Sequence, residues 1–184
     1  NRRSRGLGDV YKRQVLEGTG TRVLDTRKTT PGLRLFEKQA VVIGGGVNHR
    51  FGLFDQVLIK DNHIDYAGSV EAALEGAHRH LAEVGRSVPV VVEVRNLSEA
   101  KAAFAAGGAD RLLLDNFSPD EVRTVVDHIA GRIPTEASGG LTPDTVRAFG
   151  DAGVDYVSLG WLTHSPQSLD ISLKSAVALA ALQQ

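Results

Sequence analysis

Basic side chains are concentrated in one segment of this 184-residue chain, between Asp25 and Ile64. The segment holds six Lys and Arg residues against four acidic ones, whereas the whole chain has a formal net charge of −1. A local cluster of positive charge on a nearly neutral protein suits a small polyanion better than a nucleic-acid surface. We therefore predict a pocket for an anionic small molecule, and no nucleic-acid partner.

A second set of polar or small residues recurs at intervals of about one strand–helix unit. Each member stands at or near the end of a short apolar run, and successive members are 33, 22, 23 and 22 residues apart: Lys60, Glu93, Asp115, Ser138 and Gly160. In a (β/α) barrel the carboxyl ends of the strands converge on one mouth, where active sites lie. In an open doubly wound sheet the same residues would spread along an edge. The spacing therefore favours a barrel with its active site at the C-terminal strand ends.

The elements that would position these residues can be read from the same pattern. Short apolar runs predict buried parallel strands at Arg22–Asp25, Val57–Lys60, Val88–Val94, Arg111–Leu114, Thr135–Ala137 and Tyr156–Leu159. Amphipathic stretches predict helices at Ser69–Leu81, Ser98–Ala106, Ser118–Ile129 and Thr142–Ala152, with Ser98, Ser118 and Thr142 as N-caps. This alternation predicts an α/β fold, an incomplete TIM-like barrel of roughly six to seven parallel strands.

Glycine-containing turns are candidates for phosphate binding. Ser138-Gly139-Gly140 follows a predicted strand and precedes the helix predicted from Thr142, and Gly160 ends the next strand. Backbone N–H groups at helix N-termini bind phosphate, and the last two loops of a barrel commonly do so. The Gly44–Gly46 run is expected instead to free a loop that carries basic residues into the mouth.

Each of these residues also has an ordinary explanation. A lone Lys or Asp at a strand end is usually a solvated cap, Asp115 and Asn116 could form a simple turn, and His49 could be a satisfied core histidine. Repetition at one topological position is what favours function. The pattern alone supports a barrel enzyme with an anionic substrate.

Five longer motifs carry a resemblance to a known family: DTRKTTPGLR, GGGVNHRFGLFDQVLIKDNHI, LLLDNFSP, EASGG and SLGWLTHS. From about Val15 to the C-terminus, the chain resembles the quinolinate phosphoribosyltransferases. The resemblance implies a catalytic domain that is an incomplete α/β barrel. It also implies a reaction of NAD biosynthesis, in which quinolinate and phosphoribosyl pyrophosphate give nicotinate mononucleotide, CO2 and pyrophosphate with Mg²⁺ as cofactor.

The resemblance further implies a role for each candidate residue. The quinolinate carboxylates would be held by Arg27, His49, Arg50 and Lys60, and the phosphoribosyl donor would contact Thr26 and Lys28. Ribose hydroxyls and Mg²⁺ would be bound by Glu93 and Asp115. The 5′-phosphate would be bound by Ser138, Gly139, Gly140, Leu159, Gly160 and Trp161. The catalytic group would be Lys28, Lys60, Glu93 and Asp115.

Two positions depart from the family pattern. Arg95 stands where the family often has a second acid, and strand alternation predicts that it shares a face with Glu93, adding positive charge or pairing with that carboxylate. Trp161 stands where a small residue is usual, which would narrow the phosphate turn.

The remaining expectations concern the extent and setting of the protein. Residues 1–14 are basic and unpatterned, so we expect a non-native tail there and the catalytic domain at 15–184. The resemblance implies that an N-terminal α/β domain and the first barrel segments are missing, that this fragment alone is inactive, and that the full-length protein is a homodimer or higher homo-oligomer. No apolar run approaches the ~20 residues of a membrane span, and no secretory signal is visible, which predicts a cytoplasmic protein without a membrane partner. The absence of cysteine leaves carboxylates as the expected ligands for a metal.

Three alternatives remain open from the residues. One is a related phosphoribosyltransferase for another anionic ring, although a nicotinate-type enzyme would need fewer basic groups. Another is the phosphoribosyltransferase-like protein of molybdate-transport loci. The third is a non-catalytic barrel that binds a phosphate ligand, which would not need Lys60, Glu93 and Asp115 together.

Overall fold

The computed structural model describes residues 15–166 and 172–173 of the chain, so the predicted tail at residues 1–14 lies outside the described residues. Within them, six strands form one parallel sheet in the order β1-β6-β5-β4-β3-β2. The strands are β1 (Arg22–Leu24), β2 (Val57–Ile59), β3 (Val90–Val94), β4 (Arg111–Asp115), β5 (Thr135–Ser138) and β6 (Tyr156–Ser158). All six predicted strands are confirmed, with boundaries that differ by at most two residues.

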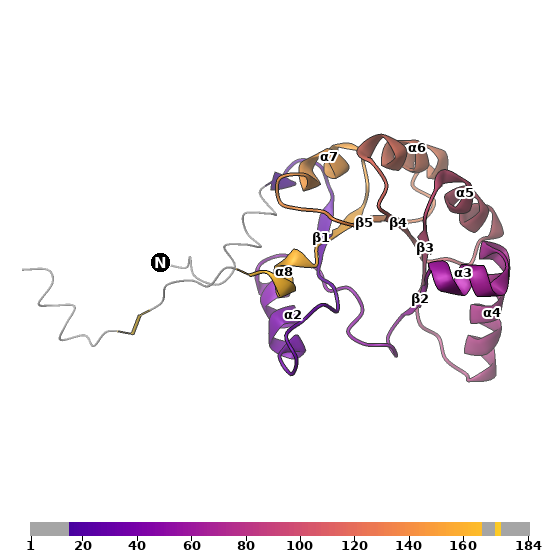
Figure 1. Cartoon of the computed structure of the whole chain (residues 1–184), viewed down its shortest axis with the longest axis horizontal. Helices are drawn as coiled ribbons and strands as arrows, with labels where there is room; N and C mark the ends of the chain where they lie inside the picture. The colour runs from indigo at the N-terminus through magenta and orange to yellow at the C-terminus, as the bar shows by residue number, and fades with distance from the viewer. Residues whose placement is uncertain (1–14, 167–171, 174–184) are drawn as a thin grey trace, which may run out of the picture.

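The sheet curves like a barrel wall but does not close (Figure 1). Strands β1 and β2 are its two edges, and β1 gains only an isolated parallel bridge between Leu24 and Val47 on its free side. The prediction of an incomplete α/β barrel is therefore confirmed, with six strands and one bridge in the described part of the chain.

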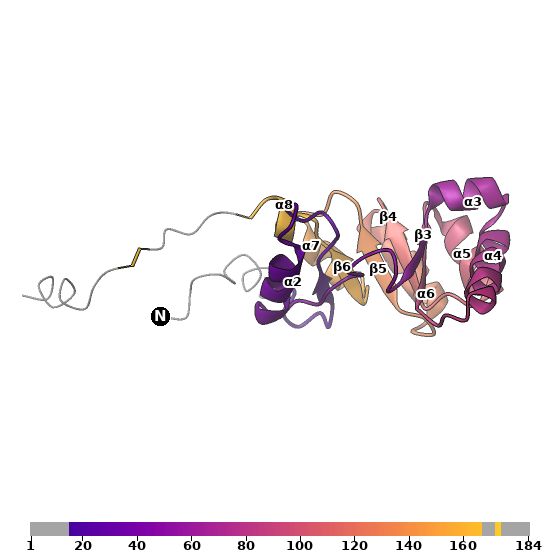
Figure 2. The same cartoon turned by 90° about the horizontal axis from the view of Figure 1, so that it is seen from below.

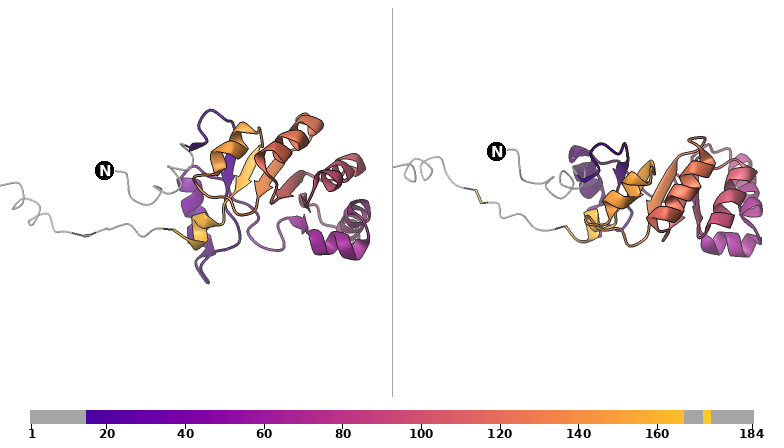
Figure 3. Two further views of the ribbon diagram at one scale, coloured as in Figure 1. Left: turned by 45° about the horizontal axis from the view of Figure 1, so that its top comes forward. Right: turned by 90° about the horizontal axis from the view of Figure 1, so that it is seen from above.

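Helices cover the outer face of this sheet (Figures 1 and 3). They are α2 (Arg34–Ile43), α3 (Asp61–Ala67), α4 (Val70–Glu83), α5 (Leu97–Ala106), α6 (Pro119–Ile129), α7 (Val146–Asp151) and α8 (Trp161–His164). Figure 2 shows α3 and α8 on the same edge of the molecule. This is the edge at the carboxyl ends of the strands, because each of these helices begins within three residues of the end of a strand.

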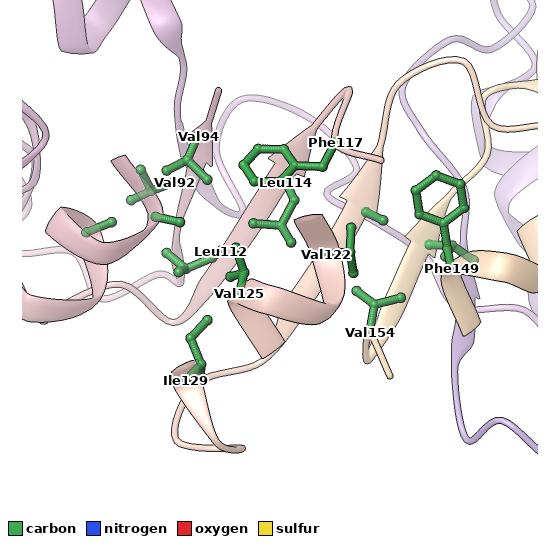
Figure 4. Close-up of a cluster of buried hydrophobic side chains, with 14 of the residues drawn as sticks. Val92, Val94, Leu112, Leu114, Phe117, Val122, Val125, Ile129, Phe149 and Val154 are labelled. Carbon is green, nitrogen blue, oxygen red and sulfur yellow. The ribbon is translucent and has the colours of Figure 1, made fainter. Parts of the chain in front are cut away.

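Strand alternation divides the buried side chains into two groups. Val92, Val94, Leu112 and Leu114 point outward into the core beneath the helices, to which α6 contributes Val122, Val125 and Ile129 (Figure 4). The intervening residues point to the inside of the curved sheet, because successive side chains of a strand point to opposite faces. Glu93, Asp115 and Ser138 belong to this inner set and line a cavity there.

Local sequence explains why α6 starts where it was predicted. Ser118 accepts a hydrogen bond from the Glu121 N–H, and the Glu121 carboxylate accepts one from the Ser118 N–H, so the two form a capping box ahead of Pro119.

The predicted caps of the two neighbouring helices were wrong. Asn96 caps α5 in place of Ser98, because its side chain accepts a hydrogen bond from the Glu99 N–H. Helix α7 begins at Val146 and not at Thr142, because Thr142 and Thr145 bond to each other in a turn that precedes the helix.

Candidate active site

A cavity of about 780 Å³ lies at the carboxyl ends of the strands. Of the fourteen predicted site residues, thirteen line it: Thr26, Arg27, Lys28, His49, Arg50, Lys60, Glu93, Asp115, Ser138, Gly139, Gly140, Gly160 and Trp161. Leu159 does not, because its side chain is buried in the hydrophobic core between the sheet and the helices. Residues from the loop after β1 through α8, more than a hundred positions apart, therefore meet in one place.

Two guanidinium groups form a strongly basic side of this cavity. The Arg27 Nε is buried and has no hydrogen-bond partner among the described residues. The pKa of Arg50 is lowered, first by burial and then by repulsion from Arg27. A bound carboxylate would offset the repulsion between the two guanidinium groups. It would also accept a hydrogen bond from the buried Nε–H of Arg27, as carboxylates commonly do with arginine.

Arg34, one of the basic residues of the same segment, has a supporting role. Its guanidinium donates hydrogen bonds to the backbone oxygens of Arg27 and Phe51 and to the Thr29 hydroxyl. Arg34 therefore braces the loop that carries Arg27.

His49 lines the cavity but does not add positive charge to it. Its Nδ1 accepts a hydrogen bond of 2.7 Å from the Arg50 N–H, and its Nε2 lies 3.5 Å from the Oε1 of Glu136. Burial, reinforced by Arg111, Arg50 and Lys38, lowers the pKa of His49 from 6.5 to about 3. The neutral ring therefore carries its proton on Nε2, facing Glu136.

Lys60 and Glu93 form an ion pair of 2.9 Å at the ends of β2 and β3. On the next strand the Asp115 carboxylate accepts a hydrogen bond of 2.8 Å from the Asn116 side chain. The described residues contain no cluster of three or more carboxylate or imidazole groups that could hold a metal ion by themselves.

Arg95 does not pair with Glu93, contrary to one of the two effects predicted for it. Its guanidinium bonds to Asp65 and Glu99, on the far side of the β3 end. The reason is that β3 ends at Val94, so strict alternation no longer applies at Arg95.

The glycine turns bring backbone close to the cavity. Gly139 has a φ of 99°, and a Cβ there would collide with the side chain of Asn116. A Cβ on Gly160 would meet His164 and the Lys28 side chain, and the Thr163 hydroxyl donates to the Lys28 oxygen at 2.6 Å. The phosphate cradle was predicted to use a helix that starts at Thr142, and that helix starts four residues later.

Several cavity and supporting residues were missed by sequence reasoning. The cavity is also lined by Leu58, Leu113, Asn116, Leu141, Thr142, Ser158 and His164. Leu113 and Ser158 could have been found by counting two residues back from Asp115 and Gly160 along each strand. Glu136 carried a signal too, because it is an acid within a strand that was predicted to be buried, and it is fully buried between His49 and Arg111. Burial raises its pKa.

Comparisons with known proteins agree on one group of relatives. The family model for the C-terminal domain of quinolinate phosphoribosyl transferase matches residues 11–174. A Bacillus subtilis protein named probable nicotinate-nucleotide pyrophosphorylase (carboxylating) is 43% identical over 181 residues, which cover 97% of this chain and 61% of the relative. The chloroplastic enzyme of Oryza sativa with the same activity in its name is 44% identical over 97% of this chain and 52% of its own length.

Solved structures show the same likeness. The crystal structure of NadC from Streptococcus pyogenes superposes with a TM-score of 0.85 at 44% identity, over 92% of this chain and 58% of that one. Nicotinate-nucleotide pyrophosphorylase from Francisella tularensis superposes with a TM-score of 0.86 at 38% identity, over 92% and 59%. The chain thus spans between about half and three fifths of the length of these relatives.

Proposed function

Because this chain belongs to the quinolinate phosphoribosyltransferase family, we propose that the protein transfers a phosphoribosyl group to quinolinate with decarboxylation. The products are nicotinate mononucleotide, CO2 and pyrophosphate. The observation that carries the proposal is the set of residues that line this cavity: two guanidinium groups, two carboxylates at adjacent strand ends, and two glycine turns.

The basic side suits an aromatic dicarboxylate. Arg27 and Arg50 bind its carboxylates, and Lys60, which lines the same cavity in an ion pair with Glu93, is a further hydrogen-bond donor. His49 lines the cavity as a neutral ring and adds no charge to it. Two carboxylates match this set better than the single carboxylate of nicotinate, which argues against a nicotinate-type enzyme.

The opposite side suits the phosphoribosyl donor. Glu93 and Asp115 accept hydrogen bonds from ribose hydroxyls, while the turns at Ser138–Gly140 and Gly160 offer backbone N–H groups to the 5′-phosphate. Trp161 and Thr26 also line the cavity. The Lys28 side chain lies beside Gly160, where it can contact the pyrophosphate of the donor.

Glu93 and Asp115 also fit a magnesium ion. Mg²⁺ keeps several waters and binds through one or two carboxylates together with substrate phosphates, so a site with only two protein carboxylates is sufficient. Bound there, the ion would stabilise the negative charge of the departing pyrophosphate.

The reaction requires positioning and charge stabilisation more than covalent help. The pyridine nitrogen forms its bond to C1′ as the C1′–O bond to pyrophosphate breaks, through an oxocarbenium-like ribose. Lys28 stabilises the leaving charge, and the fixed arginines align the ring. The bond between the ring and the carboxylate adjacent to nitrogen then breaks, and CO2 leaves. The electron pair stays on the ring carbon, where the positive nitrogen beside it stabilises it until that carbon takes up a proton.

We propose that the functional protein is a homodimer or higher homo-oligomer. This is supported by large apolar side chains exposed on α2 and on the loop before β2: Leu35, Phe36, Val42, Ile43, Leu53 and Phe54. The described residues include no helix long and apolar enough to cross a membrane. The cytoplasm is our proposal for its location, although the relatives from Oryza sativa and Arabidopsis thaliana are named as chloroplastic.

Ligand selectivity tests the proposed function. We expect a full-length version, in which this chain is extended to the length of its relatives, to bind quinolinate tenfold to a hundredfold more tightly than nicotinate. The basis is that one charge-assisted hydrogen bond contributes ~1.5–3 kcal/mol. Calorimetry with both ligands measures the ratio, and formation of nicotinate mononucleotide measures the activity. Equal affinity for the two ligands would contradict the substrate assignment.

A further inference from the structure

A buried ion pair lies behind the candidate site, outside the residues that line the cavity. The Nζ of Lys38, on α2, is 2.6 Å from the Oδ1 of Asp25, directly after β1. The Asp25 side chain is 0% exposed and that of Lys38 is 2% exposed. Neither residue reaches the cavity, so their charges do not contact a substrate.

This ion pair holds the peptide groups on both sides of His49. The His49 N–H donates a hydrogen bond of 2.7 Å to Asp25 Oδ1, and Lys38 Nζ donates one of 2.9 Å to the His49 carbonyl oxygen. With its amide nitrogen facing Asp25, the Asn48 side chain also donates to Asp25 Oδ2, at 2.7 Å. The backbone that leads into Arg50 is therefore fixed at several points.

The same pair connects the two loops that carry the guanidinium groups. Asp25 is followed at once by Thr26 and Arg27, while the His49 carbonyl that Lys38 holds belongs to the peptide joining His49 to Arg50. The Arg50 N–H of that peptide donates to His49 Nδ1. A shift of the ion pair would change the separation and direction of Arg27 and Arg50 together.

Stability alone is a poor explanation for such a pair. Removing two charges from water costs several kcal/mol for each ion, and replacing a buried pair by uncharged residues is often neutral or stabilising. Burial raises the pKa of Asp25, and the Lys38 ammonium and the His49 N–H oppose that rise. The ion pair also holds the Arg27 loop and the Arg50 loop in one fixed arrangement. Uncharged residues would not reproduce this effect.

We propose that Asp25 and Lys38 are positioning residues that set the arrangement of Arg27 and Arg50 for an aromatic dicarboxylate. This inference rests on the proposed function for the identity of the ligand. It does not rest on it for the geometry, because the hydrogen bonds to His49 exist without a substrate.

The test uses three variants of the full-length version. Lys38→Met leaves the Asp25 charge buried and unpaired. The double variant Asp25→Asn/Lys38→Met removes both charges and keeps an acceptor for the His49 N–H, but it frees the His49 carbonyl. Ile129→Ala, in the core under α6, is the control for lost stability, because its side chain is buried far from the cavity lining.

Stability and affinity should separate among these variants. We expect the melting temperature to fall by roughly 6–20 °C in Lys38→Met, and to recover most of that loss in the double variant. Quinolinate affinity should nevertheless be at least ~10-fold weaker in the double variant, because Arg50 is no longer aligned. Ile129→Ala should lose melting temperature and keep its quinolinate affinity.

Amide hydrogen exchange provides a readout that needs no substrate. In the double variant the Arg50 N–H should exchange faster relative to the Val92 N–H of β3, whereas Ile129→Ala should leave that ratio unchanged. Either wild-type quinolinate affinity or an unchanged Arg50 exchange ratio in the double variant overturns the positioning role. If the wild-type full-length version neither binds nor converts quinolinate, the proposed function fails, and the exchange ratio still decides whether the ion pair fixes the Arg50 loop.

Discussion

The basic residues of the candidate site differ in their charge. Arg27 and Arg50 are cations that repel each other in a partly dry cavity, Lys60 is neutralised by Glu93, and His49 is a neutral ring. A cluster that looks uniformly positive in the sequence is therefore a pair of guanidinium groups with neutral or paired neighbours. This arrangement favours a ligand that supplies its own negative charge between the two arginines.

The lowered pKa of His49 predicts how stability depends on pH. The folded pKa of about 3 lies below the ordinary value of 6.5, so the unfolded chain binds a proton first as the pH falls. The contribution of His49 to stability is present above pH 6.5 and is lost between pH 6.5 and 3. Between pH 6.5 and 3, His49 should lower the free energy of unfolding by about 1.4 kcal/mol for each pH unit.

Urea denaturation at pH 7, 6 and 5 measures this effect, with His49→Gln as the comparison. Gln cannot take up a proton, so the variant should lose less free energy of unfolding on acidification than the wild type. The raised pKa values of Asp25 and Glu136 act in the opposite direction, and both carboxyl groups are present in both proteins. Equal slopes for the two proteins would mean that His49 titrates normally.

Asp115 is predicted to act on the donor and not on quinolinate. Asp115→Asn keeps the size of the side chain but removes the charge that ribose hydroxyls and Mg²⁺ would use. We expect turnover of the full-length version to fall by at least ~100-fold, which is ~2.7 kcal/mol of transition-state stabilisation. Quinolinate affinity should change less than about twofold. Steady-state kinetics measures the turnover, and calorimetry measures the quinolinate affinity. A loss of quinolinate affinity with intact turnover would reverse the assigned roles.

Among the structural elements, the turn after β5 is the one that most clearly requires a glycine. Gly139 combines a φ of 99° with a position where a Cβ would collide with Asn116, the neighbour of Asp115. The turn is therefore in contact with the end of β4, and its shape affects both the proposed phosphate site and the proposed ribose site.

Gly139→Ala should consequently damage binding of the phosphoribosyl donor. We expect a rise of at least ~10-fold in the KM for phosphoribosyl pyrophosphate, because Asn116 and the turn must both move. Gly131→Ala is the matched control, since Gly131 also has a positive φ of 71° but a Cβ there meets nothing within 4 Å. The control should show a similar backbone cost in thermal denaturation with an unchanged KM. Equal KM values in the two variants would show that the Gly139 turn is not part of the donor site.

The strands could be predicted from the sequence because their evidence is local. VLI before Lys60 and LLL before Asp115 are short apolar runs, and all three leucines of the second run are buried. Short apolar runs of this kind are typical of buried parallel strands. The start of α7 was missed because Thr142 followed by Pro143 has the composition of a helix cap, and the competing Thr142–Thr145 turn differs only in its hydrogen bonds. Helix α2 was missed because its exposed face carries apolar residues such as Phe36 and Ile43, which obscure the amphipathic pattern.

The candidate site was predictable to the extent that successive strands carry a cavity-lining residue at or near their carboxyl ends. Those positions follow from topology, so the sequence alone was enough to place Lys60, Glu93 and Asp115 together. The ion pair of Lys38 with Asp25 could not be predicted, because a lysine on a helix is nearly always solvated. Its burial results from the packing of α2 against the loop at His49, which is a long-range property of the fold.

On the scale of the whole molecule, the open sheet is the dominant feature. Among the described residues no further strand pairs with β2 on its free side, and β1 gains only the bridge to Val47. Exposed apolar side chains lie on α2 and on the loop before β2. Exposed strand edges and large apolar patches are sites of association. The relatives, which are longer than this chain, have additional sequence that could cover such surfaces.

The 184 residues expressed by themselves should therefore associate and should not complete the reaction. We expect aggregated or poorly soluble material in size-exclusion chromatography, because burying the edges of the sheet and the faces of α2 is favourable at ~25 cal/mol per Å² of apolar surface. Any soluble fraction should form no detectable nicotinate mononucleotide from quinolinate and phosphoribosyl pyrophosphate. The full-length version provides the comparison, and it should be soluble and active under the same conditions. A soluble 184-residue chain that turns over quinolinate at ~1 s⁻¹ or more, a rate typical of enzymes, would show that every residue the reaction needs is already present in it.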